Sequence, residues 1–395
     1  MGLVLALVSL FLAGKVFVSR AISLPRVPNV EGMSRKIIVF KPEMASEGDR
    51  EALVQRFGGV NLKDLGLING KVVLLPPAAV EILRQQAGVL RIDDDVVVEA
   101  LADRPVISRR VKPTPKPTTP PVQVLPWGVD RIDAELVWAT TNADLIKVGI
   151  IDTGIDTGHP DLKANIKGGV NTINSWVGYN DDNGHGTHVA GIVAALNNTF
   201  GVVGVGPQID LYAVKVLDRN GSGYLSDVIE GLDWAVQHGI QVVNMSLGTS
   251  SNVLSFQEAV QRVNLAGIVQ VAAAGNSGGA VIYPAAYSQV IAVSATDQGN
   301  VIASWSSRGL EVDLAAPGVD IYSTYKGSTY KTLSGTSMAS PHVAGAAALV
   351  LDSFPGYSPA EVQNRLEQTA RELGTEGKDS LYGSGLVDVE KAVLQ

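Results

Sequence analysis

Three short segments of the chain carry the residue types that nucleophilic catalysis requires. Ser337 opens a run of small residues after a glycine, Asp152 follows an apolar run, and His185 stands between two glycines. A serine hydroxyl is a poor nucleophile at neutral pH, so it needs a neighbouring base, and that base needs an orienting acid. The order Asp, His, Ser is one in which acyl-transfer triads occur. These residues are therefore candidates for a catalytic triad.

Each candidate also has a simpler interpretation. Asp152 can cap a turn at a strand end, and Ser337 can cap the start of a helix. His185 and His188 are three residues apart, a spacing that can bind a metal, but the glutamate of a His-Glu-x-x-His zinc site is missing. We expect His188 to be a packed structural histidine. The occurrence of an acid, a base and a nucleophile at the ends of three separate elements favours the catalytic interpretation over these simpler ones.

A fourth candidate, Asn276, follows the apolar run 268–274. Its side-chain amide can donate to the oxyanion that forms during acyl transfer, together with the Ser337 backbone N–H. A helix that starts at Ser337 adds partial positive charge at the same place. Alternatively, Asn276 is a turn residue that tolerates left-handed backbone geometry.

From Val122 onward, short β-rich runs alternate with helical segments. This pattern predicts an α/β fold in which helices cover both faces of a parallel central sheet. Ligand sites in such sheets lie beyond the carboxyl ends of the strands, where Asp152 is expected. The predicted strands are 147–151, 211–217, 240–247, 268–274 and 290–295.

Several helix boundaries are also predicted. The helix at 226–238 should end at Gly239, and Pro341 should lie in the first turn of its helix, where proline is tolerated. A serine followed three residues later by a glutamate predicts two capping boxes, Ser255 with Glu258 and Ser358 with Glu361.

A small α+β unit is predicted at residues 35–101, ahead of the catalytic segment at 122–395. Its expected strands are 36–40, 71–75 and 96–100, and its expected helices are 47–57 and 78–86. Residues 102–121 are rich in proline and basic side chains, which favours an extended, solvated linker.

Composition narrows the function classes. The 395 residues are 46% hydrophobic, enough to bury a large core. The net charge of -8 argues against a nucleic-acid partner, because phosphate binding needs concentrated positive charge. The absence of cysteine excludes disulfides and thiol catalysis. Residues 1–21 contain a short apolar run that predicts a signal peptide and secretion, with a retained membrane anchor as the alternative.

The catalytic candidates lie in motifs that resemble those of the subtilisin-like serine proteases, or subtilases. The motifs are DTG from Asp152, HGTHVAG from His185 and GTSMASP from Gly335, and the resemblance extends from about Gln123 to the C-terminus. It implies an endopeptidase with Asp152 as orienting acid, His185 as general base and acid, Ser337 as nucleophile and Asn276 as oxyanion donor.

The resemblance also implies that the enzyme is a zymogen. Residues 35–101 would be a propeptide that assists folding and inhibits the enzyme from within the active-site cleft. Autocleavage is then expected near Leu101 or Ala102, followed by trimming of the linker near Arg110 or Pro121.

Substrate and cofactor predictions follow from the same resemblance. Peptides would add as a strand beside Ser246, Leu247 and Gly248. The first specificity pocket would be lined by Gly248, Ala273 and Gly275, with Ile282 shortening it in favour of medium-sized apolar side chains. Calcium is the implied cofactor, with oxygen ligands from Gln123, Asp161, Leu196, Asn198, Phe200 and Val202.

Two other functions fit the same scaffold. One is a catalytically silent binding protein, which the intact triad and Asn276 disfavour. The other is a non-proteolytic serine esterase, which the propeptide-like unit disfavours. We expect a monomeric protease acting on proteins and peptides.

Overall fold

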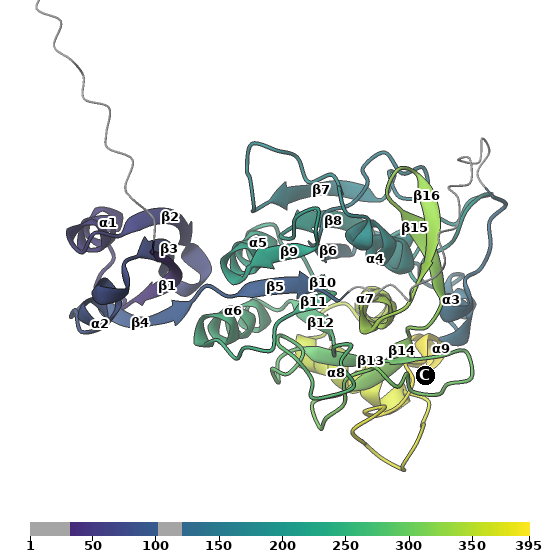
Figure 1. The fold of residues 1–395 in the computed structure, drawn as a ribbon. Helices are drawn as coiled ribbons and strands as arrows, with labels where there is room; N and C mark the ends of the chain where they lie inside the picture. Colours follow the sequence, from purple (N-terminus) through teal and green to yellow (C-terminus); the bar gives the residue numbers. More distant parts are fainter. Residues whose placement is uncertain (1–31, 102–120) are drawn as a thin grey trace, which may run out of the picture.

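The computed structural model describes residues 32–101 and 121–395. A small N-terminal unit lies beside a larger α/β body (Figure 1). The predicted signal peptide or anchor at 1–21 and all but the last residue of the predicted linker lie outside the described residues. Within the described part of the chain, no helix is both long and apolar enough to cross a membrane.

The larger body is built on a sheet of seven parallel strands, which confirms the predicted fold class. Their order is β14-β13-β12-β10-β6-β8-β7. The strands are β6 (Lys147–Asp152), β7 (Ile166–Asn171), β8 (Asp210–Lys215), β10 (Val242–Met245), β12 (Val269–Ala273), β13 (Ile291–Thr296) and β14 (Leu314–Pro317).

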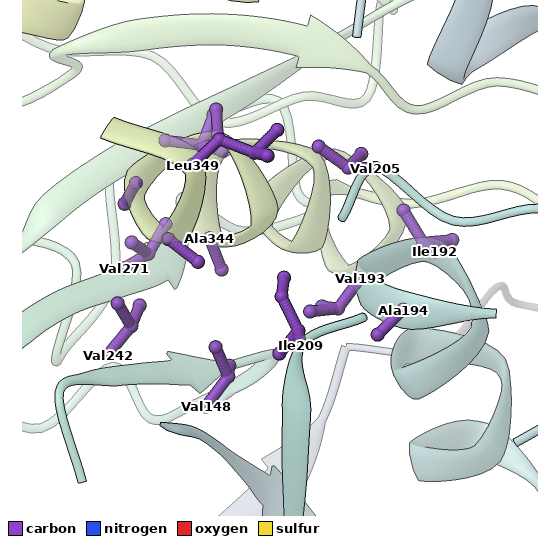
Figure 2. Packing of buried hydrophobic residues seen from close by; sticks show 14 of the residues in the cluster. Val148, Ile192, Val193, Ala194, Val205, Ile209, Val242, Val271, Ala344 and Leu349 are labelled. Atoms are coloured by element: carbon purple, nitrogen blue, oxygen red, sulfur yellow. The ribbon is translucent and has the colours of Figure 1, made fainter. Parts of the chain in front are cut away.

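Helices cover both faces of this sheet. Neighbouring residues of a strand point to opposite faces, and the residues on both faces are apolar, so each face needs a covering layer. The helices of the body are α3 (Trp127–Arg131), α4 (His185–Ala194), α5 (Leu225–Gln237), α6 (Leu254–Leu265), α7 (Thr336–Ser353), α8 (Pro359–Thr369) and α9 (Val389–Leu394). Val242 and Val271 lie on the side of the sheet that faces α7, as Figure 2 shows, whereas Val243 and Ala272 share a buried cluster with α5 and α6.

The N-terminal unit is a four-stranded antiparallel sheet in the order β2-β3-β1-β4. Ile38 and Phe40 pack against its own two helices, whereas Ile37 and Val39 share a buried cluster with α5 and α6 of the larger body. The elements are β1 (Ser34–Phe40), β2 (Val60–Leu65), β3 (Gly70–Leu75), β4 (Val89–Asp94), α1 (Glu47–Arg56) and α2 (Pro77–Arg84).

Three short elements join the unit to the body. The run predicted at 96–100 is a strand, β5 (Val97–Ala100), but it does not belong to the sheet of the small unit. It lies between β9 (Ser222–Tyr224) and β11 (Leu247–Gly248) in a separate three-stranded sheet. A hairpin of β15 (Ile321–Tyr325) and β16 (Thr329–Leu333) completes the described strands.

The predicted helix boundaries had mixed outcomes. Ser358 caps α8 in a capping box with Glu361, as predicted, and α5 ends just before Gly239, whose φ is 63°. The capping box at Ser255 is wrong, because α6 starts one residue earlier, at Leu254. Ser255 donates through its amide at 3.0 Å and its hydroxyl at 2.6 Å to Asp93 of β4, so the small unit supplies the cap.

Candidate active site

Asp152 and His185 come together from the ends of two elements. β6 ends at Asp152, and α4 begins at His185. His185 Nδ1 lies 2.8 Å from Asp152 Oδ1 and 2.9 Å from Oδ2, and both side chains are buried. The close approach depends on Gly186, where a Cβ would lie 2.2 Å from the Gly154 carbonyl oxygen.

The surroundings of the His185 ring favour its protonated form. Burial alone would lower the pKa of His185, but the charge and hydrogen bond of Asp152, with the charge of Asp181, outweigh it and raise the pKa above its ordinary value of 6.5. A base of this kind gains affinity for the proton that it must accept. The ring and carboxylate therefore have the electrostatics of a general base and its orienting acid.

Ser337 is the second residue of α7. Its hydroxyl donates to the Leu101 carbonyl oxygen at 3.0 Å and lies 3.1 Å from the Ser246 carbonyl oxygen. His185 Nε2 is buried and has no hydrogen-bond partner among the described residues. The contact between Asp152 and His185 in the predicted triad is thus formed, while the Ser337 hydroxyl donates to Leu101, the residue that follows β5.

Pro341 lies in the second turn of α7, so its predicted place in the first turn is wrong. Proline has no N–H, and the carbonyl four residues earlier, that of Ser337, loses its helical donor. The Ser246 hydroxyl donates to this carbonyl at 2.9 Å instead. Ser246, predicted only as part of the substrate edge, also supports the backbone of the candidate nucleophile.

Asn276 lies beyond the end of β12 with its amide oriented from behind. Its Oδ1 accepts from the Thr336 N–H at 2.9 Å and the Thr336 hydroxyl at 2.8 Å. Its Nδ2 therefore points the other way and donates to the Leu101 carbonyl oxygen at 2.8 Å. This is the contact expected of an oxyanion donor.

A carbonyl of the chain itself thus lies where a substrate carbonyl is expected. Leu101 follows β5, whose residues pair antiparallel with both flanking strands. The Leu101 N–H donates to the Ser246 carbonyl at 3.2 Å, and the Ala100 N–H donates to Gly221 at 2.8 Å. The edge predicted at Ser246 to Gly248 is therefore paired, and β9 forms a second edge that the sequence did not reveal, because its three residues lack apolar alternation.

The residues predicted to line the specificity pocket are neighbours. A Cβ on Gly248 would lie 2.5 Å from Ile282 Cδ1, and one on Gly275 would lie 3.4 Å from Ile282 Cγ1. Ala273 is the buried last residue of β12, two residues before Gly275. The branched Ile282 side chain thus packs against both glycines and occupies space between them.

The predicted calcium residues also converge. Asn198 Nδ2 donates to Asp161 Oδ1 at 2.6 Å, the Val202 N–H donates to Oδ2 at 2.9 Å, and Gln123 Nε2 donates to the Leu196 carbonyl at 3.1 Å. The Phe200 N–H donates to Asn198 Oδ1 at 2.8 Å.

The chemistry of this loop fits calcium. Burial raises the pKa of Asp161 despite its hydrogen bonds, which include one from the Tyr330 hydroxyl at 3.1 Å, and no Lys or Arg forms an ion pair with this carboxylate among the described residues. A cation would offset the cost of the buried charge. The described residues hold no cluster of three His, Asp or Glu side chains fit for a metal. Calcium suits the other predicted ligands, which are side-chain amide oxygens and backbone carbonyl oxygens.

Two other buried groups lie close to the site. His188 Nε2 lies 2.9 Å from the Lys331 carbonyl and 3.1 Å from the Ile321 carbonyl, and burial lowers its pKa to about 3, in keeping with the predicted structural role. Asp181, which the sequence prediction missed, accepts hydrogen bonds from the loop that carries His185. Its position four residues before the histidine is the signal that could have identified it.

Comparison with known proteins agrees with this geometry. Residues 144–385 match the Subtilase family. The chain is 50% identical to subtilisin Savinase of Lederbergia lenta over 275 residues, which are 68% of this chain and 99% of that protein. It is 40% identical to subtilisin amylosacchariticus of Bacillus subtilis subsp. amylosacchariticus over 365 residues, 90% of this chain and 89% of that protein. The chain therefore belongs to the subtilase family and is a subtilisin-like serine endopeptidase.

Proposed function

We propose that the protein is a secreted endopeptidase made as a zymogen, with Asp152, His185 and Ser337 as its triad and Asn276 as oxyanion donor. One observation carries the proposal. The carbonyl oxygen of Leu101 accepts hydrogen bonds from Asn276 Nδ2 at 2.8 Å and from Ser337 Oγ at 3.0 Å. The peptide bond that follows Leu101 is therefore the first substrate.

The chemistry follows from these groups. Ser337 Oγ attacks the Leu101 carbonyl carbon while His185 Nε2 takes the hydroxyl proton, and Asp152 stabilises the resulting imidazolium. Asn276 and the Ser337 N–H stabilise the oxyanion. The bond to Ala102 breaks as His185 returns the proton to the leaving amine, which leaves an acyl-enzyme. Water, deprotonated by His185, then hydrolyses the ester and restores Ser337.

Residues 35–101 would act as the inhibitor and folding template. Two aspartates of the N-terminal unit each accept a hydrogen bond from the start of one helix of the body. Asp93 accepts from Ser255 of α6, and Asp95 accepts from the Ser226 N–H of α5 at 2.9 Å. The N-cap residue of α6, Val253, provides no side-chain cap, and in α5 Asp227 accepts from the N–H of the N-cap residue Tyr224 at 3.1 Å, which leaves the Ser226 N–H to Asp95. These contacts support a unit that stabilises both helices during folding.

The extent of the similarity supports the same organisation. The match to subtilisin amylosacchariticus covers 365 residues, more than the 274 residues of 122–395, so it reaches into the segment before residue 122. Residues 1–21 would direct export, and residues 102–121 would be a linker removed after the first cut.

Calcium would be held by the carboxylate of Asp161, the amide oxygens of Gln123 and Asn198, and the carbonyls of Leu196, Phe200 and Val202. Bound there, it would neutralise the buried charge and stabilise the loop. A chelator should lower the midpoint of thermal unfolding of the mature enzyme, and Asp161→Asn should remove that dependence. Equal chelator sensitivity in both proteins would place calcium elsewhere.

The proposal is tested by the mass and N-terminal sequence of the products that the full chain makes on its own. We expect the first cut between Leu101 and Ala102, followed by hydrolysis of casein. A first cut before Lys36, or a mature chain that retains residues 35–101 and is fully active, would contradict the proposal.

A further inference from the structure

Asp181 is a buried carboxylate next to the N-terminus of α4. The residue is only 4% exposed, and its side chain accepts five hydrogen bonds from four residues. Oδ1 accepts from the hydroxyl of Thr153 and from two backbone amides, and Oδ2 accepts from both the amide and the hydroxyl of Thr187. These distances are Thr153 Oγ1 2.9 Å, Asn183 N 2.9 Å, Gly184 N 2.8 Å, Thr187 N 3.0 Å and Thr187 Oγ1 2.6 Å.

Thr153 extends this cluster to the neighbouring strand. Its hydroxyl donates to Asp181 and accepts from the Gly186 N–H at 2.9 Å. Its own N–H donates to Asp152 Oδ1 at 2.7 Å. Asp181 and Thr153 therefore tie the strand end that carries the acid to the first turn that carries the histidine.

The same two residues complete the start of α4. The first amides of a helix have no partner within the helix. Here the His185 N–H donates to Asn183 Oδ1 at 3.0 Å, the Gly186 N–H to Thr153 Oγ1, and the Thr187 N–H to Asp181 Oδ2. The helix has no side-chain cap from its own N-cap residue, Gly184. Asp181 and its partners supply that function.

We propose that Asp181 is a positioning residue, which holds the first turn of α4 against Thr153 so that the His185 ring meets Asp152, and whose charge stabilises the imidazolium. This inference rests on the proposed role of His185 as general base. Asp181 touches neither the Leu101 carbonyl nor Ser337, so it acts through the histidine.

The charges around His185 agree with this role. Burial lowers the pKa of the ring, whereas Asp152 and, after it, Asp181 raise it. Three other sets of ionisable groups lie close by. They are His188 on the same helix, Tyr325 of β15, whose hydroxyl donates to the Asn183 carbonyl at 3.2 Å, and the ion pair of Lys215 Nζ of β8 with Asp182 at 2.7 Å. Loss of the Asp181 charge should therefore lower the pKa of His185.

The test compares Asp181→Asn with Asp182→Asn in the full chain. Each variant removes one negative charge from adjacent positions, but the Asp182 side chain is 54% exposed and pairs with Lys215. We measure the rate of self-cleavage. We also measure kcat and KM as a function of pH, per active site, on a peptide substrate with Leu immediately before the cleaved bond. For Asp181→Asn we expect kcat to fall about 10- to 100-fold, the order that misplacement of a catalytic group produces. KM should stay unchanged, and the acid limb should move to lower pH.

Asp182→Asn should keep both kcat and the limb close to the wild type. A fall in kcat without any shift of the acid limb, or equal effects of the two variants, would overturn the inference. Hydrolysis by the wild type that depends on Ser337 and His185 would leave the proposed function standing in either case.

A second pair covers failure of Asp181→Asn to fold. Thr153→Val removes the hydroxyl that joins Asp181 to Gly186, whereas Thr153→Ser keeps it. We expect the valine variant to lose kcat and the serine variant to recover most of it at unchanged KM. Equal kcat in the two variants would overturn the inference.

Discussion

The side-chain amide of Asn276 donates to the carbonyl oxygen of Leu101 at 2.8 Å. Its other end is fixed by Thr336, at 2.9 Å from the backbone and 2.8 Å from the hydroxyl, so the amide cannot turn without losing both bonds. A donor held in this way is ready before charge develops on the oxygen. The relationship makes residue 101 the last residue before the expected cut.

Asn276→Leu should therefore slow the chemical step. Removal of one oxyanion donor costs about 10² to 10³ in kcat, a magnitude known from a subtilisin of this family. KM should change little, because the contact strengthens in the transition state. Steady-state kinetics on a peptide substrate give both values. An unchanged kcat would remove Asn276 from the oxyanion site.

The raised pKa of His185 sets the pH dependence. The ring must be neutral to accept the Ser337 proton, so activity should rise as pH passes through its pKa. Because Asp152 holds that pKa above 6.5, the midpoint of the acid limb of kcat/KM should lie above pH 6.5. A profile with its midpoint below that value would contradict the electrostatic account.

Three consecutive aspartates provide an internal control for the role of the N-terminal unit. Asp93 faces α6, whereas the Asp94 side chain is 68% exposed and pairs with Lys36 of the unit itself. Loss of a helix cap costs about 0.5–2 kcal/mol. Asp93→Ala should weaken inhibition by residues 35–101 and release activity sooner after self-cleavage, and Asp94→Ala should not. Indistinguishable time courses of casein hydrolysis would contradict the capping role.

Ile282 should control the size of the residue accepted before the cut. Its side chain packs against Gly248 and Gly275, so Ile282→Gly opens the space between them. We expect the wild type to prefer Leu over Phe at this position and the variant to shift towards Phe, measured as the ratio of kcat/KM for the two peptides. The same ratio in both enzymes would show that Ile282 does not limit the pocket.

Structural features that depend on neighbouring residues in the sequence could be predicted. Features that depend on partners far away in the sequence were missed. The parallel strands, the end of α5 before Gly239 and the Ser358 cap follow from patterns a few residues long. Ser255 has the same local pattern as Ser358, but Asp93, 162 residues earlier, takes its amide and hydroxyl. β9 has no apolar alternation of its own and is recognised only through its pairing with β5.

The active site shows the same division. The candidates Asp152, His185, Ser337 and Asn276 came from the sequence because each lies at or near the end of an element, within a distinctive motif. Asp181 was missed although it lies only four residues before His185, because its role depends on the contact that folding creates with Thr153, 28 residues away. The support of the Ser337 carbonyl by Ser246 is likewise a consequence of packing between β10 and α7.

The most direct test of the account is the mass of the full chain and of Ser337→Ala, expressed side by side and followed over time. The wild type should lose the segment up to Leu101 and then hydrolyse casein, whereas the variant should remain a single uncut chain. For a family relative, removal of this serine costs about 10⁶ in kcat, so the contrast should be complete. Cleavage after Leu101 in purified Ser337→Ala at the wild-type rate would contradict the claim that Ser337 cuts its own chain.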